Sequence, residues 1–215
     1  MIDLATLRDE LRLLVIAGPP VVPVARLVPS CRAAVEGGAT AVQVRLKGVG
    51  AGETLALAER LVAELDVPVW VNDRADVALA AGACGVHVGQ DDIPPIAVRA
   101  LAGDRLLVGI SAGNATEAET AQAAPVDYWS IGAVFPTGTK ADAGDPIGLD
   151  GFRVLRRMAP AGMPVLAIGG IEADRVPDLV RAGACGVAVS RAVLGAVDIA
   201  RAARDLRRAL DAALP

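Results

Sequence analysis

Two lysines and their polar neighbours are the strongest chemical signal in this sequence. Lysine occurs only at Lys47 and Lys140, against 19 arginines. A compact ammonium group contacts a phosphate oxygen in a different geometry from a planar guanidinium. Two lysines in an arginine-rich chain therefore indicate positions at which lysine, and not arginine, is required. Lys47 ends the segment Gln43–Lys47, in which alternate residues of an extended strand share one face. Gln43, Arg45 and Lys47 therefore predict a binding site for an anion.

Two carboxylates predict a divalent cation beside this site. Asp73 follows Asn72 at the end of an apolar run, and Asp92 ends the segment Gly85–Asp92. If these runs are neighbouring parallel strands, both carboxylates lie at one edge and could share one Mg²⁺, which also takes substrate phosphate oxygens and water. Asp73 could instead cap the helix that follows it, and Asp91 is an alternative to Asp92 that the spacing leaves open.

Glycine and hydroxyl residues predict a further phosphate site. Gly169-Gly170 follows an apolar run, and Val189-Ser190 ends the next one. Loops at these two places form the common phosphate site of barrel enzymes, where backbone N–H groups approach the anion closely. Ser111 also ends an apolar run. These features predict a phosphorylated ligand without naming it.

Nucleophilic catalysis is not indicated. His87 is the only histidine, and a lone histidine within a strand is more often a hydrogen-bonded structural residue than a catalyst. No Ser–His–Asp or Cys–His arrangement is visible. Cys31, Cys84 and Cys185 show no C-x-x-C spacing, which argues against zinc and disulfides.

Alternating strands and helices must position these residues. Eight short runs, apolar on both faces, predict strands covered by helices: Leu13–Ala17, Ala41–Lys47, Pro68–Asp73, Gly85–Gln90, Leu106–Ser111, Tyr128–Phe135, Pro164–Ile171 and Gly186–Ser190. Amphipathic segments between them predict helices: Val24–Gly38, Gly52–Asp66, Ala75–Gly82, Pro95–Gly103, Ala115–Ala124, Leu149–Ala161, Ala173–Gly183 and Ile199–Leu214.

Eight strand–helix units predict a (β/α)₈ barrel that forms a single domain over residues 1–215. An open doubly wound sheet is the alternative, but no G-x-G-x-x-G follows the first strand. An internal repeat favours closure, because segment 81–88 is echoed by segment 182–189, half a barrel later. Active sites of such barrels lie at the carboxyl ends of the strands, where the polar residues above are expected.

Composition excludes several classes of protein. The net charge is −4 with no basic block, which argues against nucleic acid as a partner. Mean hydropathy is +0.47, but no apolar run reaches the roughly 18 residues of a membrane helix. Met1–Glu10 is charged and lacks a signal-peptide core. We expect a cytoplasmic protein that binds small phosphorylated molecules and leave open whether it forms a homo-oligomer.

The ordered motifs resemble those of the thiamine-phosphate synthase family over nearly the whole chain. The family patterns Q-x-R-x-K, N-D, H-x-G-Q-x-D and P-T-x-T-K all occur. The matching stretches are Val42–Lys47, Val71–Arg74, Gly85–Asp92, Gly109–Ser111, Phe135–Lys140, Ala167–Ile171 and Val189-Ser190. The chain departs from the family after the first and fifth strands, at Ala17–Pro20 and Ala112–Asn114, where contacts to the bases are in question.

The resemblance implies a Mg²⁺-dependent transferase that joins an aminopyrimidine methyl diphosphate to a hydroxyethylthiazole phosphate and releases pyrophosphate. It implies a dissociative path, which needs positioning and charge stabilisation but no nucleophilic side chain. The implied pyrimidine diphosphate site is Gln43, Arg45, Lys47, Asn72, Ser111 and Lys140, of which Arg45, Lys47, Ser111 and Lys140 are catalytic. The implied thiazole phosphate site is Thr137, Thr139, Gly170, Val189 and Ser190. The implied Mg²⁺ ligands are Asp73 and Asp92.

Two alternatives are weighed against this function. A related thiazole tautomerase needs a proton-transfer residue, and the tautomerases of this superfamily place a histidine where this chain has Ser111. A non-catalytic sensor of phosphorylated ligands on the same scaffold would have no need for a metal site beside a diphosphate clamp.

Overall fold

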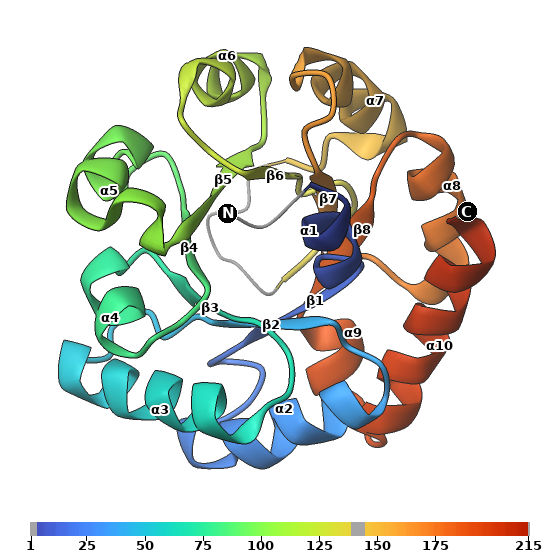
Figure 1. The fold of residues 1–215 in the computed structure, drawn as a ribbon. Helices are drawn as coiled ribbons and strands as arrows, with labels where there is room; N and C mark the ends of the chain where they lie inside the picture. Colours follow the sequence, from blue (N-terminus) through green and yellow to red (C-terminus); the bar gives the residue numbers. More distant parts are fainter. Residues whose placement is uncertain (1–3, 139–144, 215) are drawn as a thin grey trace.

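The computed structural model describes residues 4–138 and 145–214. Eight parallel strands close into a barrel in sequence order. They are β1 (Leu13–Ala17), β2 (Ala41–Val44), β3 (Val69–Asn72), β4 (Gly85–Val88), β5 (Leu107–Ala112), β6 (Tyr128–Ile131), β7 (Val165–Ile168) and β8 (Gly186–Val189). The predicted (β/α)₈ barrel is confirmed, with the strands at the centre and a ring of helices around them (Figure 1).

All eight predicted helices are present. They are α2 (Leu27–Glu36), α3 (Ala51–Glu64), α4 (Ala75–Ala80), α5 (Pro95–Ala102), α6 (Ala115–Ala123), α7 (Gly148–Met158), α8 (Val176–Arg181) and α10 (Ile199–Ala213). Short 3₁₀ turns η1 (Val24–Arg26), η2 (Gly103–Arg105) and η3 (Ala173–Arg175) flank three of them. The sequence did not predict α1 (Leu4–Glu10) or α9 (Arg191–Leu194), which are too short to show periodicity. No helix in the described ranges is long and apolar enough to cross a bilayer.

Several strands are shorter than predicted. Strand β2 ends at Val44, so Arg45 and Lys47 lie in the loop that follows it. The predicted strand end at Lys47 is therefore wrong, although Gln43, Arg45 and Lys47 still line one cavity, as expected. Arg45 still donates its backbone N–H to the carbonyl of Ala17 at 2.9 Å, which holds the start of this loop against β1.

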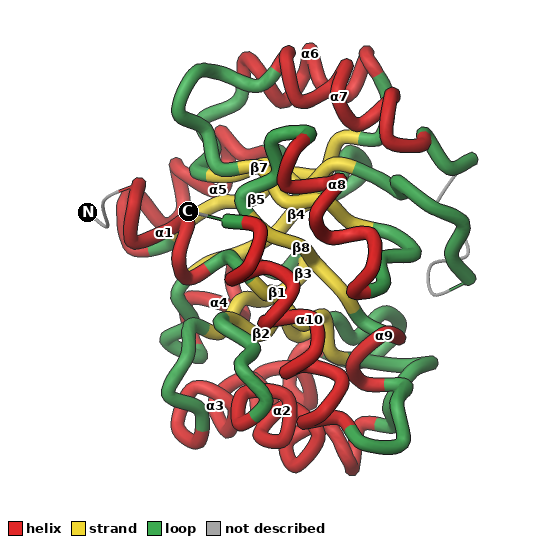
Figure 2. Tube along the Cα trace, turned by 90° about the vertical axis from the view of Figure 1, so that its right-hand side faces the viewer, coloured by secondary structure: helices red, strands yellow, loops and turns green. Residues whose placement is uncertain are grey.

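The barrel interior is apolar at one end and polar at the other. From the amino ends of the strands inward it is filled by Leu7, Leu11, Leu14, Ala41, Trp70, Tyr128, Leu166 and Ala188, of which Leu14, Tyr128 and Ala188 reach a cavity at the carboxyl ends. Leu7 belongs to α1, and the side view shows α1 at the amino end of the barrel (Figure 2). Alternate residues of a strand face the same side, so residues two positions further on also face inward. These include Gln43 after Ala41, Asn72 after Trp70, and Ser130 after Tyr128. The sheet therefore presents polar side chains at the end opposite α1.

The internal repeat has a packing role at the apolar end. Gly85 and Gly186 occupy equivalent positions at the starts of β4 and β8. A Cβ on Gly85 would lie 2.4 Å from the ring of Trp70, and one on Gly186 would lie 2.2 Å from the carbonyl oxygen of Leu11. Both glycines are required by close packing inside the barrel.

Candidate active site

Two adjoining cavities lie at the carboxyl ends of the strands. The larger, of about 720 Å³, is lined mainly by segments after β6, β7 and β8, and the smaller, of about 140 Å³, mainly by the ends of β2, β3 and β4. Six residues line both: Ile16, Arg45, Ser111, Ser130, Ile168 and Ala188. We call the smaller cavity the charged half of the mouth, after Lys47, Asp73 and Asp92. We call the larger cavity the glycine half, after Gly169 and Gly170.

Lys47 and two aspartates form one cluster in the charged half. The ammonium group of Lys47 pairs with the carboxylate of Asp73 and lies 3.9 Å from Oδ1 of Asp92. Oδ2 of Asp92 accepts a hydrogen bond from the backbone N–H of Gly89 at 2.8 Å. Asp91 is exposed and makes no ion pair with any described residue. The geometry thus gives Asp92, and not Asp91, the position beside Asp73 and Lys47.

The backbone at Asp73 turns its side chain toward the mouth. Asp73 has φ +64°, and no other non-glycine residue in the described ranges has a positive φ. Its N–H donates to the carbonyl of His87 at 2.8 Å, which ties it to β4. The N-cap of α4 is Arg74, and no side chain caps this helix. Asp73 is therefore not the helix cap that the sequence left open, and a left-handed conformation costing about 1 kcal/mol is kept there.

The carboxyl groups of Asp73 and Asp92 titrate as a pair. Burial and the neighbouring Asp92 carboxyl raise the pKa of Asp73, although Lys47 opposes them. Burial opposes the shift of Asp92, but Asp73, the Gly89 amide and Lys47 together lower its pKa. Two carboxylates in contact repel each other unless a proton or a cation lies between them. The cluster therefore has an affinity for one additional positive charge.

Ser111 is anchored by β4 and the segment that follows it. Its Oγ lies 2.9 Å from Nε2 of His87, and Nδ1 of His87 lies 2.7 Å from the hydroxyl oxygen of Tyr128. The Ser111 carbonyl also accepts a hydrogen bond from the side chain of Gln90 at 2.7 Å. His87 is buried, so it is placed as a hydrogen-bonding residue behind Ser111.

Gln43 and Asn72 line the charged half from inside the barrel. Gln43 is only 2% exposed, and its amide nitrogen has no hydrogen-bond partner among the described residues. Asn72 ends β3 and is half-buried beside His87, its register partner on β4. A buried amide nitrogen without a partner is uncommon in proteins and indicates a place for a ligand acceptor.

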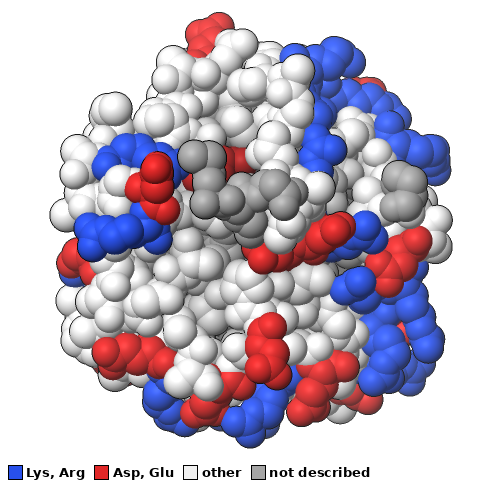
Figure 3. Space-filling view, in the orientation of Figure 1, with Lys and Arg blue, Asp and Glu red and all other residues white. Residues whose placement is uncertain are grey.

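Arg45 differs from the arginines on the outer surface. Figure 3, viewed from the α1 end, shows basic side chains gathered over α7, α8 and α10. Several of these pair with acids of their own helix, as Arg153 does with Asp150 and Arg207 with Asp211. Arg45 lines both cavities and makes no ion pair with any acid in the described ranges. Arg45 therefore does not balance the charge of Asp73 or Asp92, because Lys47 occupies that position.

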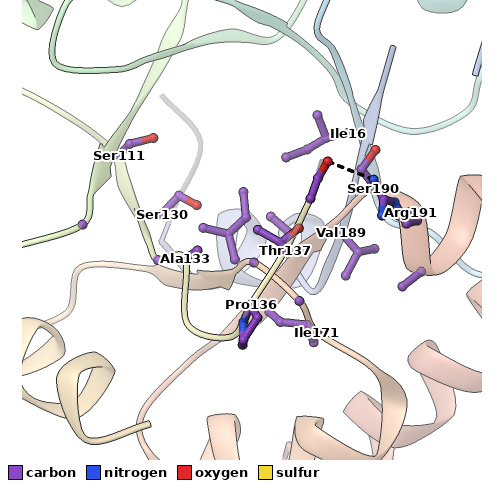
Figure 4. A pocket seen from close by; sticks show the side chains of 18 of the residues that line it. Ile16, Ser111, Ser130, Ala133, Pro136, Thr137, Ile171, Val189, Ser190 and Arg191 are labelled. Atoms are coloured by element: carbon purple, nitrogen blue, oxygen red, sulfur yellow. Dashed lines mark hydrogen bonds between the residues drawn. The ribbon is translucent and has the colours of Figure 1, made fainter. Parts of the chain in front are cut away.

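The glycine half is built by close backbone packing. Gly169 and Gly170 have φ +98° and +62°. A Cβ on Gly170 would lie 2.5 Å from the carbonyl oxygen of Pro136, and one on Gly169 would lie 2.6 Å from the Cα of Ala133. Only glycine allows the β6 and β7 loops to approach this closely. Figure 4 shows Thr137, Val189 and Ser190 around the same cavity, with Ser111 and Ser130 across from them.

Two predicted residues, Thr139 and Lys140, lie outside the described residues. The rest of the predicted set lies in the two halves of the mouth. Gln43, Lys47, Asn72, Asp73 and Asp92 line the charged half, whereas Thr137, Gly170, Val189 and Ser190 line the glycine half. Arg45 and Ser111 border both.

Three residues of the mouth were not predicted. Ser130 is 2% exposed, and its hydroxyl has no partner among the described residues. The guanidinium of Arg175 lies 4.1 Å from the ring centre of Phe135, and Arg191 donates to the carbonyl of Gly138 at 3.0 Å (Figure 4). Strand alternation from Tyr128 could have revealed Ser130. Nothing in the sequence distinguishes Arg175 and Arg191 from the other arginines.

Comparisons with known proteins agree on one family. The family model described as thiamine monophosphate synthase matches residues 13–193. The thiamine-phosphate synthase of Moorella thermoacetica is 45% identical over 179 residues, covering 82% of this chain and 84% of that protein. The thiamine-phosphate synthase of Chloroflexus aurantiacus is 49% identical over 178 residues, covering 81% of each.

Solved structures show the same likeness. Thiamine phosphate pyrophosphorylase from Pyrococcus furiosus superposes with a TM-score of 0.86 at 36% identity, covering 97% of this chain and all of that one. Orotidine 5'-phosphate decarboxylase from Pyrococcus horikoshii superposes at 0.71 with 17% identity, covering 93% and 99%, which shows a shared barrel fold only.

Proposed function

The chain belongs to the thiamine monophosphate synthase family, and from that premise we propose which residues of its mouth carry the reaction. It is a transferase that joins an aminopyrimidine methyl diphosphate to a hydroxyethylthiazole phosphate, giving thiamine phosphate and pyrophosphate. One observation carries the assignment of residues: a cavity lined by cations and carboxylates adjoins a cavity lined by glycines. The first suits a diphosphate and the second a monophosphate.

The charged half holds the diphosphate. Lys47 supplies a compact positive charge, and Arg45 supplies a planar guanidinium that can donate to two oxygens at once. Together they neutralise the leaving group. Ser111 adds a hydroxyl group from β5. Arg45 borders both halves of the mouth, and the bond to pyrophosphate breaks at this border. Lys140 remains a predicted third cation from the loop after β6.

Mg²⁺ fits beside the diphosphate on Asp73 and Asp92. The two carboxyl groups carry more negative charge than the single Lys47 beside them can balance. In the described part of the chain, no cluster of three or more His, Cys, Asp or Glu side chains able to hold a metal occurs. Mg²⁺ commonly takes one or two carboxylates and fills its other positions with phosphate oxygens and water. When bound, the ion would neutralise charge that develops on the leaving pyrophosphate.

The pyrimidine ring lies over the polar layer of the barrel interior. Gln43 from β2 and Ser130 from β6 each present a buried polar atom without a partner in the described ranges. A nitrogen-containing ring offers acceptors and an amino group to such atoms, and Asn72 lies in the same layer. Binding of the ring satisfies groups that are otherwise costly to bury, by about 1–3 kcal/mol each.

The glycine half holds the thiazole phosphate. Gly169 and Gly170 bring backbone amides close to the anion, and Val189 and Ser190 border it from β8. Thr137 adds a side chain from the loop after β6, and Thr139 remains a predicted contact.

The chemistry follows a dissociative course. Pyrophosphate leaves as its charge is stabilised in the charged half, and the thiazole nitrogen captures the pyrimidine methyl cation across the shared wall. Catalysis therefore consists of positioning and charge stabilisation. A tautomerase is not favoured, because Ser111 ends the interior face of β5 and His87 lies buried behind it.

Pyrophosphate release tests the proposal. The purified chain should release pyrophosphate only when Mg²⁺, the pyrimidine diphosphate and the thiazole phosphate are all present. Each omission serves as a control. Isomerisation of the thiazole phosphate without pyrophosphate release would instead establish the tautomerase.

A further inference from the structure

Three side chains on adjacent strands form a hydrogen-bonded row that ends at the mouth. Tyr128 on β6 contacts Nδ1 of His87 on β4 at 2.7 Å, and Nε2 of His87 contacts Oγ of Ser111 on β5 at 2.9 Å. Tyr128 is fully buried and His87 is 8% exposed, whereas Ser111 is half-buried and borders both cavities. The row leads from the closed interior of the barrel to a substrate-facing hydroxyl.

The direction of these hydrogen bonds is decided at Tyr128. Its hydroxyl has no hydrogen-bond partner other than His87 among the described residues. If Nδ1 carried the proton and donated to Tyr128, the tyrosine's own O–H would be buried and unpaired, which proteins rarely tolerate. Burial also raises the pKa of Tyr128, so it keeps its proton at neutral pH. Tyr128 therefore donates to Nδ1.

The rest of the row follows from the chemistry of imidazole. A neutral ring that accepts at Nδ1 carries its hydrogen on Nε2. Nε2–H then donates to Oγ of Ser111, so the hydroxyl proton of Ser111 must point elsewhere. The open direction is the cavity that Ser111 lines.

We propose that Tyr128 and His87 are positioning residues that make Ser111 a hydrogen-bond donor toward the anionic oxygens of the diphosphate, an inference that rests on the proposed function. With the opposite tautomer, Ser111 would donate to His87 and turn its lone pairs toward the anion. The same serine would then repel the ligand that it is placed to bind. The buried tyrosine thus selects the useful arrangement from two that share the same heavy-atom positions.

Nitrogen NMR tests the tautomer without any assumption about activity. His87 is the only histidine, so ¹⁵N-histidine labelling of the chain without an affinity tag reports on this ring alone. We expect a protonated Nε2 and an unprotonated Nδ1 in the wild type, and a shift toward the Nδ1–H tautomer in Tyr128→Phe. A wild-type ring protonated at Nδ1 would overturn the proposal.

Kinetics test whether the tautomer acts through Ser111. Tyr128→Phe should lower kcat/KM for the pyrimidine diphosphate about tenfold while the melting temperature shows that the fold is kept. In a Ser111→Ala background the same change should have almost no further effect. Additive losses, or normal activity of Tyr128→Phe, would refute the role of Ser111 as the target. A wild type that turns over neither substrate would count against the proposed function, while the NMR result would still stand.

Discussion

The two halves of the mouth bind anions by different physical means. The charged half uses side chains that carry full charges, Lys47 beside Asp73 and Asp92. The glycine half uses backbone geometry, with Gly169 and Gly170 in conformations that other residues rarely adopt. Both halves are lined by residues at the ends of one closed ring of parallel strands, and Figures 1 and 2 show that ring.

The contrast is clearest at the internal repeat. Both copies form a strand that begins at a packed glycine. The third residue of the strand is His87 in β4 and Ala188 in β8, and the residue after the strand is Gly89 in the first copy and Ser190 in the second. The backbone framework is therefore equivalent, and the side chains after it decide the chemistry. The charged half should respond to changes of charge and pH, and the glycine half to changes of volume.

The largest effect is expected from Asp92→Ala. Loss of a carboxylate beside the diphosphate should lower kcat/KM about 10³-fold, because a metal ion contributes several kcal/mol of charge stabilisation. Asp91→Ala is the matched control and should stay within about threefold of the wild type. Rates of pyrophosphate release and melting curves measure both variants. Full turnover in excess chelator would contradict the metal assignment.

Arg45→Lys should be nearly as damaging, although the charge is kept. Lys47 already supplies a compact positive charge, so Arg45 contributes a guanidinium group that donates to two oxygens at once. Because a lysine side chain at position 45 cannot do this, kcat/KM should fall about 10²-fold. Arg207→Lys on α10, where the arginine pairs with Asp211, is the control and should change little. Activity close to wild type in Arg45→Lys would remove Arg45 from the catalytic residues.

Gly170→Ala tests whether the glycine half depends on space. The added methyl group would overlap the carbonyl oxygen of Pro136, so we expect KM for the thiazole phosphate to rise about tenfold with KM for the diphosphate unchanged. Gly82→Ala is the matched control, since Gly82 has φ +67° but no atom within 4 Å of the added Cβ. Its conformational cost of about 1 kcal/mol should lower Tm by roughly 2–4 °C and leave both KM values alone. Equal KM changes in the two variants would show that φ, and not space, is decisive.

The smallest effect is a pH-dependent response to Mg²⁺. The pKa of Asp73 is raised in the folded state, so its proton stabilises the fold at acid pH and this stabilisation is lost as pH rises through the folded pKa. Mg²⁺ replaces the proton, so saturating Mg²⁺ should raise Tm by a few degrees more at about pH 7.5 than at about pH 4.5. Asp73→Asn should remove the difference. An equal rise at both pH values would place the ion elsewhere.

Much of the fold could be predicted from the sequence because its signals are local. Short apolar runs separated by amphipathic segments predicted eight strands and eight helices, and the structure contains all of them. Strand ends were less accurate, since β2 stops at Val44 where the chain leaves the sheet. Helices α1 and α9 were missed because seven and four residues are too few for a periodic pattern.

The sequence by itself also determined the chemical types available at the mouth, since scarce lysines, paired aspartates and adjacent glycines are visible without a structure. Tertiary structure alone decided which of them meet. The left-handed turn at Asp73 brings its carboxylate to Lys47, and barrel closure places Ser130 and Gln43 in one polar layer. The row from Tyr128 through His87 to Ser111 joins residues up to 41 positions apart. Such contacts depend on strand register and burial, which arise only when the whole barrel closes.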